Sequence, residues 1–277
     1  MVTRHPRAVG AIALVFITGL FSFPACHKKK DTGANYLPPL DDGSKESQPE
    51  EPDDPSLPPP PHTSPHPGVA DSPAMVASEN NLKQIAVAFH NSEKIYGAFP
   101  LGIADGKGKV GLSWRVAVLP YLAQEKLYKQ FKLDEPWNSE HNRRLIERIP
   151  QVYAPPGVRS NGYTYYRSFS GPGAILPPPR RPGRPGEPIL GLRTDQIPDG
   201  LANTLMIAEG PVPVIWTKPD ELPFTPGNPP KLGGGLFDGG FHAAFCDGNI
   251  KFIKSSIDAA TLSNLIQTND GNMVKLP

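Results

Sequence analysis

The sequence has little cysteine and almost no net charge. Two cysteines in 277 residues are too few for a disulfide scaffold or a cysteine-based zinc site. The 28 lysines and arginines nearly balance 27 aspartates and glutamates, for a net charge of +1. Because no basic or acidic field stands out, we expect no nucleic-acid partner and no polycation partner. The absence of a Gly-X-Y period excludes collagen.

Proline, in contrast, is abundant and unevenly placed. The chain has 36 prolines, about 13% against a usual ~5%. Twelve of them fall within residues 38–73, so the chain is not one compact domain from end to end. The remainder still carries about twice the usual proline content, which disfavours a helical bundle because proline breaks helix interiors.

The first residues have the order of an export signal. Arg4 and Arg7 precede sixteen uncharged residues, 8–23, which fall short of the roughly 20 that a spanning helix needs. Cys26 directly after Ala25 resembles a bacterial lipobox, in which the cysteine is acylated and becomes the mature N-terminus. An uncleaved membrane anchor and a plain secreted signal remain alternatives. All three place the rest of the chain at the cell envelope.

A proline-rich linker follows the signal. Residues 31–73 are almost devoid of aliphatic and aromatic side chains, so they cannot bury enough apolar area to offset their ordering entropy. We interpret this tract as a stalk or simple spacer, and a proline-rich recognition ligand is the alternative. The expected organisation is a signal peptide of lipoprotein type at 1–26, a disordered linker at 27–73 and a folded domain at 74–277.

The folded domain opens with helix signals. Ser72 before Pro73 is a helix start, and Gly97 is a helix stop. Between them, apolar residues fall at helical spacing on one face: Leu82, Ile85, Ala86 and Phe89. We expect further helical stretches over 113–131 and 138–150.

Strand signals dominate the second half. Residues 162–170 and 204–208 read as strands, and Asp247-Gly248 between two apolar runs predicts a hairpin. Asp258 predicts a last helix through Gln267. The expected class is α+β: a long N-terminal amphipathic helix packed on a small antiparallel sheet, with long Pro/Gly-rich loops at 171–188 and 211–230.

Catalytic and metal-binding sets are poorly supported. The best nucleophile candidate combines Cys246, His242 and Asp238, but four residues along one strand put the first two about 13 Å apart. We therefore read Cys246 as a buried small side chain and expect no catalytic residues, so the chain is not expected to be an enzyme. No histidine, cysteine or acidic spacing indicates a metal, and we expect no cofactor.

Surface contact is the remaining possibility for specific residues. Trp216 lies in a proline-rich segment and is the aromatic candidate for an exposed contact. Arg180, Arg181 and Arg184 lie in the loop at 171–188 and could meet an anionic surface, with a solvated loop as the alternative. Trp114 and Trp137 are expected in the core.

Several blocks together carry a family resemblance. The blocks are Asn80 to Ile85, Phe89-His90-Asn91, Tyr96 to Pro100, Leu112 to Val116, Leu119 to Leu122, Leu133 to Trp137, Trp216 to Pro219, Gly233 to Phe237 and Asp247-Gly248-Asn249. The sequence resembles the bacterial domain of unknown function DUF1559, also labelled a solute-binding-like family, over residues 75–272. Many members carry prepilin-type N-termini.

The resemblance implies a type IV pilin-like or pseudopilin-like fold and no established activity. The pilin-like members begin with a Gly-Phe-Thr-Leu-x-Glu prepilin site inside a long hydrophobic helix, and this chain has neither. Both absences place filament assembly in doubt, whatever the fold. The expected role is a non-enzymatic, envelope-tethered structural or protein-interaction module, with a membrane and an unknown envelope protein or glycan as partners. The alternative is a solute- or glycan-binding module that uses loops 171–188 and 211–230.

Overall fold

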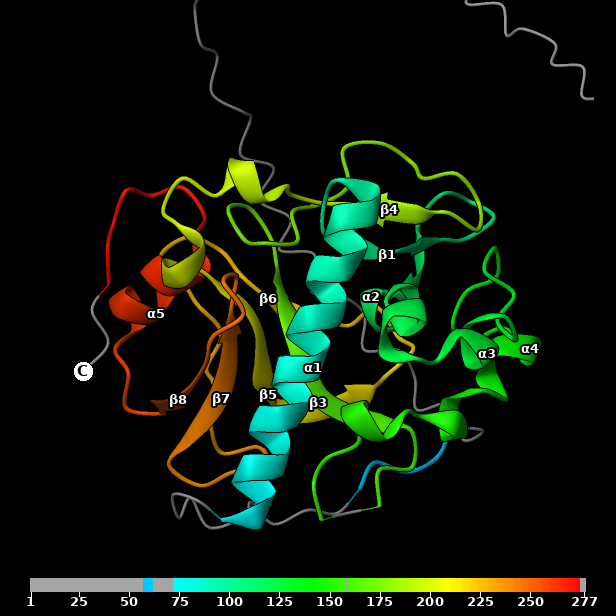
Figure 1. Ribbon diagram of the computed structural model, residues 1–277, viewed down its shortest axis with the longest axis horizontal. Helices are drawn as coiled ribbons and strands as arrows, with labels where there is room; N and C mark the ends of the chain where they lie inside the picture. Colours follow the sequence, from blue (N-terminus) through cyan, green and yellow to red (C-terminus); the bar gives the residue numbers. More distant parts are fainter. Residues whose placement is uncertain (1–56, 62–71, 158, 275–277) are drawn as a thin grey trace, which may run out of the picture. The chain divides into compact units, whose positions relative to one another are not determined.

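The computed structural model describes residues 57–61, 72–157 and 159–274. These residues form a mixed α+β domain with two sheets, in agreement with the expected α+β class (Figure 1). The proposed acylation site, Cys26, and most of the linker lie outside the described residues. None of the described helices is long and apolar enough to cross a membrane.

Helix α1 (Pro73–Tyr96) is framed by local signals at both ends. The Ser72 hydroxyl accepts a hydrogen bond from the Met75 N–H at 3.3 Å. Gly97 adopts a left-handed φ of 78°, and its N–H donates to the Glu93 carbonyl at 2.7 Å. The buried face of α1 consists of Met75, Ser78, Leu82, Ile85, Ala86, Ala88, Phe89 and Ser92.

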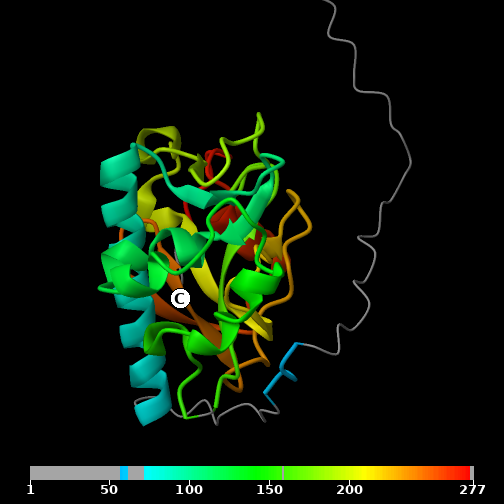
Figure 2. The same cartoon turned by 90° about the vertical axis from the view of Figure 1, so that its right-hand side faces the viewer.

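A five-stranded sheet forms the main layer. Its order is β6 (Leu222–Pro223), β3 (Tyr163–Ser170), β5 (Leu205–Ile215), β7 (Gly240–Phe245) and β8 (Ile250–Lys254). Strand β6 runs parallel to β3, and the other neighbours are antiparallel. Helix α1 packs against β5, β7 and β8 and lies along one side of the molecule (Figure 2).

The hairpin of β7 and β8 and the last helix form where the turn and capping residues predict them. Asp247 and Gly248 form the turn of the β7–β8 hairpin, where Gly248 has φ 87° and donates its N–H to the Phe245 carbonyl at 2.9 Å. Helix α5 (Ala259–Ile266) is capped by Asp258, whose carboxylate accepts from the Thr261 N–H at 2.8 Å. Both predictions are confirmed.

A second, three-stranded sheet was not expected. It has the order β2 (Val110–Ser113), β1 (Pro100–Ala104), β4 (Pro188–Leu190) and is antiparallel. Strand β1 is buried at all five positions, so its sequence lacks the polar alternation that identifies a half-buried strand. The expectation of a single small antiparallel sheet is therefore corrected to two sheets, of which the larger is mixed.

The segment 211–230, expected to be irregular, begins inside a strand. Strand β5 continues to Ile215 through Pro211 and Pro213. Its pairing with β3 jumps from Thr164–Val214 to Tyr166–Glu209, so the prolines lie in an interruption of the ladder. Proline tolerates such a bulge because no ladder hydrogen bond is required of it there.

The helical stretches after β2 are shorter than predicted. The chain turns at Ala123, which has a left-handed φ of 56° and ends a one-turn helix. The result is a series of single helical turns: α2 (Trp114–Ala117), η1 (Leu119–Leu122), α3 (Glu125–Tyr128), α4 (Glu140–Arg143), η2 (Ile146–Arg148), η3 (Gln151–Tyr153), η4 (Thr194–Gln196) and η5 (Leu201–Asn203).

The core joins both sheets and α1, and a piece of the expected linker lies against it. Trp114 and Trp137 belong to this core, as predicted, with exposed fractions of 0% and 8%. Leu57 is partly buried against the core, and the Tyr163 hydroxyl donates to the Pro58 carbonyl at 2.8 Å. Residues 57–61 are therefore held on the domain, unlike the unpacked linker expected there.

Candidate functional site

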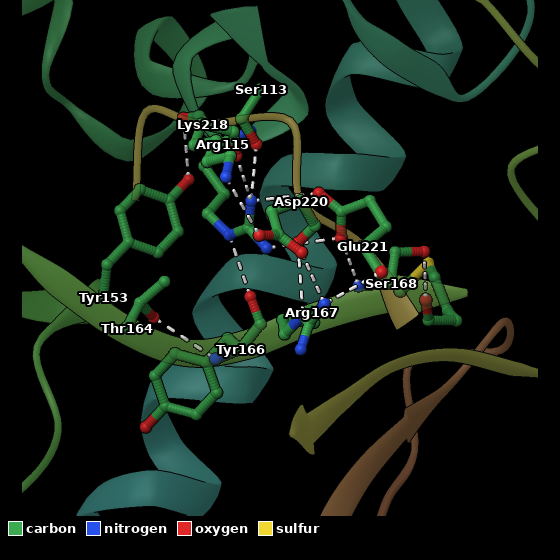
Figure 3. Close-up of polar contacts among 11 residues, drawn as sticks. Ser113, Arg115, Tyr153, Thr164, Tyr166, Arg167, Ser168, Lys218, Asp220 and Glu221 are labelled. Atoms are coloured by element: carbon green, nitrogen blue, oxygen red, sulfur yellow. Dashed lines mark hydrogen bonds and ion pairs between the residues drawn. The ribbon is translucent and has the colours of Figure 1, made fainter. Parts of the chain in front are cut away.

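Arg115 is a fully buried cation whose donors are engaged on several sides (Figure 3). Its Nη1 and Nη2 donate to the two carboxylate oxygens of Glu221 at 3.0 and 3.2 Å. Its Nε donates to the Tyr166 carbonyl at 2.8 Å, and Nη1 also donates to the Ser113 hydroxyl at 2.6 Å. This two-pronged geometry is the strong form of an arginine–carboxylate pair.

Arg167 forms a second pair beside the first (Figure 3). Its Nη2 donates to the Asp220 carboxylate at 2.6 Å and to the Glu221 carbonyl at 2.9 Å. The Ser168 N–H completes the arrangement by donating to Glu221 Oε2 at 2.7 Å. Arg115, Arg167, Asp220 and Glu221 are called the arginine clamp below. The clamp ties α2, strand β3 and the segment before β6 together.

Burial governs the electrostatics of the clamp. Desolvation raises the pKa of the Glu221 carboxyl, and the Arg115 charge opposes that shift. Desolvation likewise lowers the pKa of Arg167, opposed by Asp220 and Glu221. The Glu221 carboxylate contacts the Arg115 guanidinium and the Ser168 N–H. The half-exposed Asp220 carboxylate contacts Arg167 and Lys218, so the charges of the clamp are paired with one another. This pairing leaves no free group aimed at a ligand from this cluster.

A second buried network crosses from α1 to the sheet. The Glu209 carboxylate accepts from the Ser78 hydroxyl and from the His242 backbone N–H, the latter at 2.7 Å. The ring Nδ1 of His242 lies 3.1 Å from Glu209 Oε1. The Tyr166 hydroxyl is 2.7 Å from the Ser78 hydroxyl. These four side chains therefore link the first turns of α1 to β3, β5 and β7.

The nucleophile candidate is not assembled. His242 directs Nδ1 to Glu209, and its ring lies 5.3 and 5.0 Å from the rings of Phe237 and Phe252. Among the described residues no hydrogen bond joins Cys246 to His242. The Cys246 thiol is fully buried, and desolvation raises its pKa, which disfavours the reactive thiolate. Asp238 is exposed, and in the part of the chain that the structure describes no hydrogen bond or ion pair joins it to His242.

The prediction that Trp216 is an exposed aromatic contact is wrong. Its side chain is fully buried, and its Nε1 donates to the Ile146 carbonyl at 2.8 Å. The indole stacks on Tyr153 with ring centroids 5.9 Å apart and meets the edge of Phe131 at 5.8 Å. The proline-rich context misled the expectation because β5 runs to the residue before Trp216 and carries it into the core.

The loop at 171–188 is buried at Ala174, Ile175 and Leu176, whereas the arginine-containing part that follows is exposed, as a contact site requires. Arg180, Arg181 and Arg184 are all solvent-exposed, and none of them forms an ion pair with any other described residue. The loop is anchored from below, because the Gly183 N–H donates to the Gly108 carbonyl at 2.8 Å. These three arginines therefore lie on a fixed loop with their charges toward solvent.

A shallow groove runs beside the outer face of α1. It has a volume of about 540 Å³ and is lined by Val87 of α1, Tyr121 and Leu122 of η1, and Pro150 and Val152 around η3, among others. Burial raises the pKa of Tyr121 to about 12. The groove therefore offers mainly apolar side chains and a neutral phenol.

The described residues contain no group of three histidine, cysteine, aspartate or glutamate side chains placed to hold a metal ion. The arginine clamp and the Glu209–His242 network could not be found from sequence. Arg115 and Glu221 are 106 residues apart, and Glu209 and His242 are 33 apart, so no local spacing marks them. A polar residue inside an otherwise apolar strand, such as Glu209, is the one available signal.

The geometry defines a class: a mixed α+β domain whose buried charges are paired with each other. Residues 76–172 match the family model SBP_bac_10, described as protein of unknown function (DUF1559). This is the family that the sequence motifs indicate, over a shorter range than the 75–272 expected. No curated protein and no solved structure gives a significant match.

Proposed function

We propose that this protein is a non-enzymatic interaction module, tethered at the cell envelope, with a pilin-like arrangement of one long helix on a sheet. One observation carries the proposal. The buried groups capable of acid–base or nucleophilic chemistry are bound to each other, as in Glu209–His242 and Arg115–Glu221, while the accessible features are loops and a shallow groove. Such a surface suits contact with a partner better than chemistry on a substrate.

Two further features support the details. Helix α1 lies across β5, β7 and β8, which is the helix-on-sheet packing that the family resemblance implies. The sequence before the domain, with Cys26 after a short apolar run, supports attachment to a membrane. Without a prepilin site, the tethered domain would act singly rather than in a filament.

Site-directed photo-crosslinking in intact cells tests this function. A photoreactive residue replaces either Arg181 in the basic loop or Val87 at the α1 groove, both of which are exposed. We expect a discrete adduct from at least one position. We also expect Cys246→Ala and His242→Gln chains that remain folded to give the same adduct. A folded, envelope-located protein without any adduct, or one whose adduct needs His242, would contradict the proposal.

A second candidate is a solute- or glycan-binding module. The exposed arginines at 180–184 favour it, because guanidinium groups bind carboxylate, sulfate and phosphate in a fork. The segment 211–230 contributes less than expected, since its first residues belong to β5 and Trp216 is buried. Loss of binding to polysaccharides on removal of the loop arginines would support this candidate. Unchanged binding would remove it.

A further inference from the structure

The turn between β1 and β2 lies directly against the basic loop. The Gly183 N–H donates to the Gly108 carbonyl at 2.8 Å. Gly108 has φ 76°, and a Cβ there would lie 2.8 Å from the Gly183 carbonyl oxygen. Only glycine allows this close approach. Two segments about 75 residues apart in sequence are thus fixed to each other at their tips.

This contact brings two sets of cations together. Lys107 and Lys109 flank Gly108, and Arg184 follows Gly183 directly. Because consecutive Cα atoms are about 3.8 Å apart, each of these charges starts one residue from the Gly108–Gly183 bond. We call the set the basic platform; its members are Lys107, Lys109, Arg180, Arg181 and Arg184.

The platform charges remain available to a partner. All five side chains are exposed, and none of them takes part in an ion pair with another described residue. One carboxylate oxygen of Asp105, Oδ1, accepts hydrogen bonds from the backbone N–H groups of Lys107 and Lys109 at 2.8 and 3.0 Å. Five cations against the nearby Asp105, Asp134 and Glu187 leave an excess of two positive charges.

We propose that the basic platform binds an anionic polysaccharide, one that carries carboxylate, sulfate or phosphate groups along its length. Arginine forks match these groups, and spaced cations suit an extended chain of charges. Protein interfaces, in contrast, are depleted in lysine and have an apolar core. The platform consists of two lysines and three arginines, and the segments that carry them, 105–109 and 180–187, contain no aromatic residue.

The position of the platform in the domain favours a polymer over the membrane of attachment. Residues 57–61, which contact the domain through Pro58, and the start of α1 lie at one end of the domain, whereas β1, β4 and the loop above them lie at the other end of that helix (Figures 1 and 2). A helix of 24 residues is about 36 Å long. The platform therefore faces away from the end where the tether joins. The inference rests on the second candidate function, glycan binding, and deepens it by naming the charge of the glycan and by adding Lys107 and Lys109 to the site.

Binding of the full-length protein to dextran sulfate, with uncharged dextran as reference, tests the inference. The platform variant changes all five cations to glutamine. The matched control changes five other exposed lysines to glutamine, so both have the same net charge: Lys94, Lys126, Lys231, Lys251 and Lys254. We expect the platform variant to lose about tenfold or more in affinity and to flatten the salt dependence, because fewer counterions are released. The control variant should lose less than about twofold.

Three outcomes overturn the inference. The first is an equal loss of affinity for dextran sulfate in the two variants, and the second is no binding of dextran sulfate at low salt. The third is binding to phosphatidylglycerol vesicles that disappears in the platform variant although that variant still binds dextran sulfate. Circular dichroism of both variants establishes that they are folded; the Gly108–Gly183 contact itself is untouched by these changes. If one of these three outcomes occurs while the crosslinked envelope adduct persists, the inference fails and the interaction-module function stands.

Discussion

The buried arginines show how this domain handles charge in its interior. Arg115 has no exposed surface, yet its guanidinium contacts Glu221, Ser113 and the Tyr166 carbonyl. A buried pair gains little net stability over apolar residues, but removal of one partner leaves an uncompensated charge. The clamp therefore specifies how α2, β3 and the segment before β6 meet.

The first prediction concerns that clamp. Arg115→Met removes the partner of the buried Glu221 carboxylate and should cost about 3–5 kcal/mol in the free energy of unfolding. Urea denaturation measures the loss. Arg144→Met is the control, because Arg144 pairs with Glu140 on the surface, where both side chains are mostly exposed. Similar small losses in both variants would show that the clamp is not electrostatically coupled.

The second prediction uses pH. Burial lowers the pKa of His90, a shift that Glu93 opposes, and no described group bonds its Nε2. The folded state therefore resists protonation more than the unfolded state does. Stability from this group is complete above the unfolded value of about 6.5 and falls as the pH drops below it, until the folded pKa is reached.

His90→Gln should accordingly flatten the loss of stability between pH 7.5 and pH 5. Chemical denaturation at several pH values across this window measures the effect. His141→Gln, at an exposed histidine of α4, controls for the loss of one imidazole. An unchanged pH slope in His90→Gln would mean that burial of this ring does not contribute to acid sensitivity.

At the scale of elements, α1 holds the domain through aromatic contacts. Phe89 is fully buried, with its ring 5.4 Å from Phe99 and 5.1 Å from Trp114. Phe89→Ala should cost about 3–5 kcal/mol, since a large cavity would remain between α1 and the β1–β2 region. Val87→Ala, on the exposed face at 58% exposure, is the matched control and should change little. Thermal and urea unfolding measure the free energy of unfolding of both variants, and equal values would contradict the prediction.

Elements with a local cause could be predicted from sequence, and those with a distant cause could not. Ser72, Asp258 and Asp247-Gly248 act within three or four residues, so they mark α1, α5 and the β7–β8 hairpin. Strand β4 exists only because β1 pairs with it across some 85 residues. No propensity near Pro188 indicates such a partner.

The residues of the basic platform likewise fall into those that the local sequence predicts and those that depend on a distant contact. The exposure of Arg180, Arg181 and Arg184 follows from a local run of proline, glycine and charge. The lysines that join them do not, because the Gly108–Gly183 contact is tertiary. The prediction for Trp216 is wrong because the prolines around it indicate a loop locally, whereas pairing of β5 with β3 keeps the chain in a strand up to Ile215.

At the scale of the whole molecule, the attachment to the membrane can be tested through one residue. If Cys26 is acylated, Cys26→Ser should abolish palmitate labelling and move the protein from the membrane fraction to the soluble fraction. Cys246→Ser is the control, because that thiol is buried inside the domain. Persistence of Cys26→Ser in membranes would favour an uncleaved anchor.

The contact of Leu57 and Pro58 with the domain shortens the segment between Cys26 and the first residue held on the domain. A segment from Cys26 to Ser72 would have 46 residues, at most about 160 Å of contour. With Leu57 packed on the core and Pro58 bonded to Tyr163, it ends 31 residues after Cys26, at most about 110 Å. If Cys26 is the point of attachment, the contact of Leu57 and Pro58 thus lowers the greatest distance at which the domain can lie from the membrane. Breaking a single hydroxyl–carbonyl bond, with Tyr163→Phe, would help release the docked segment and increase that distance.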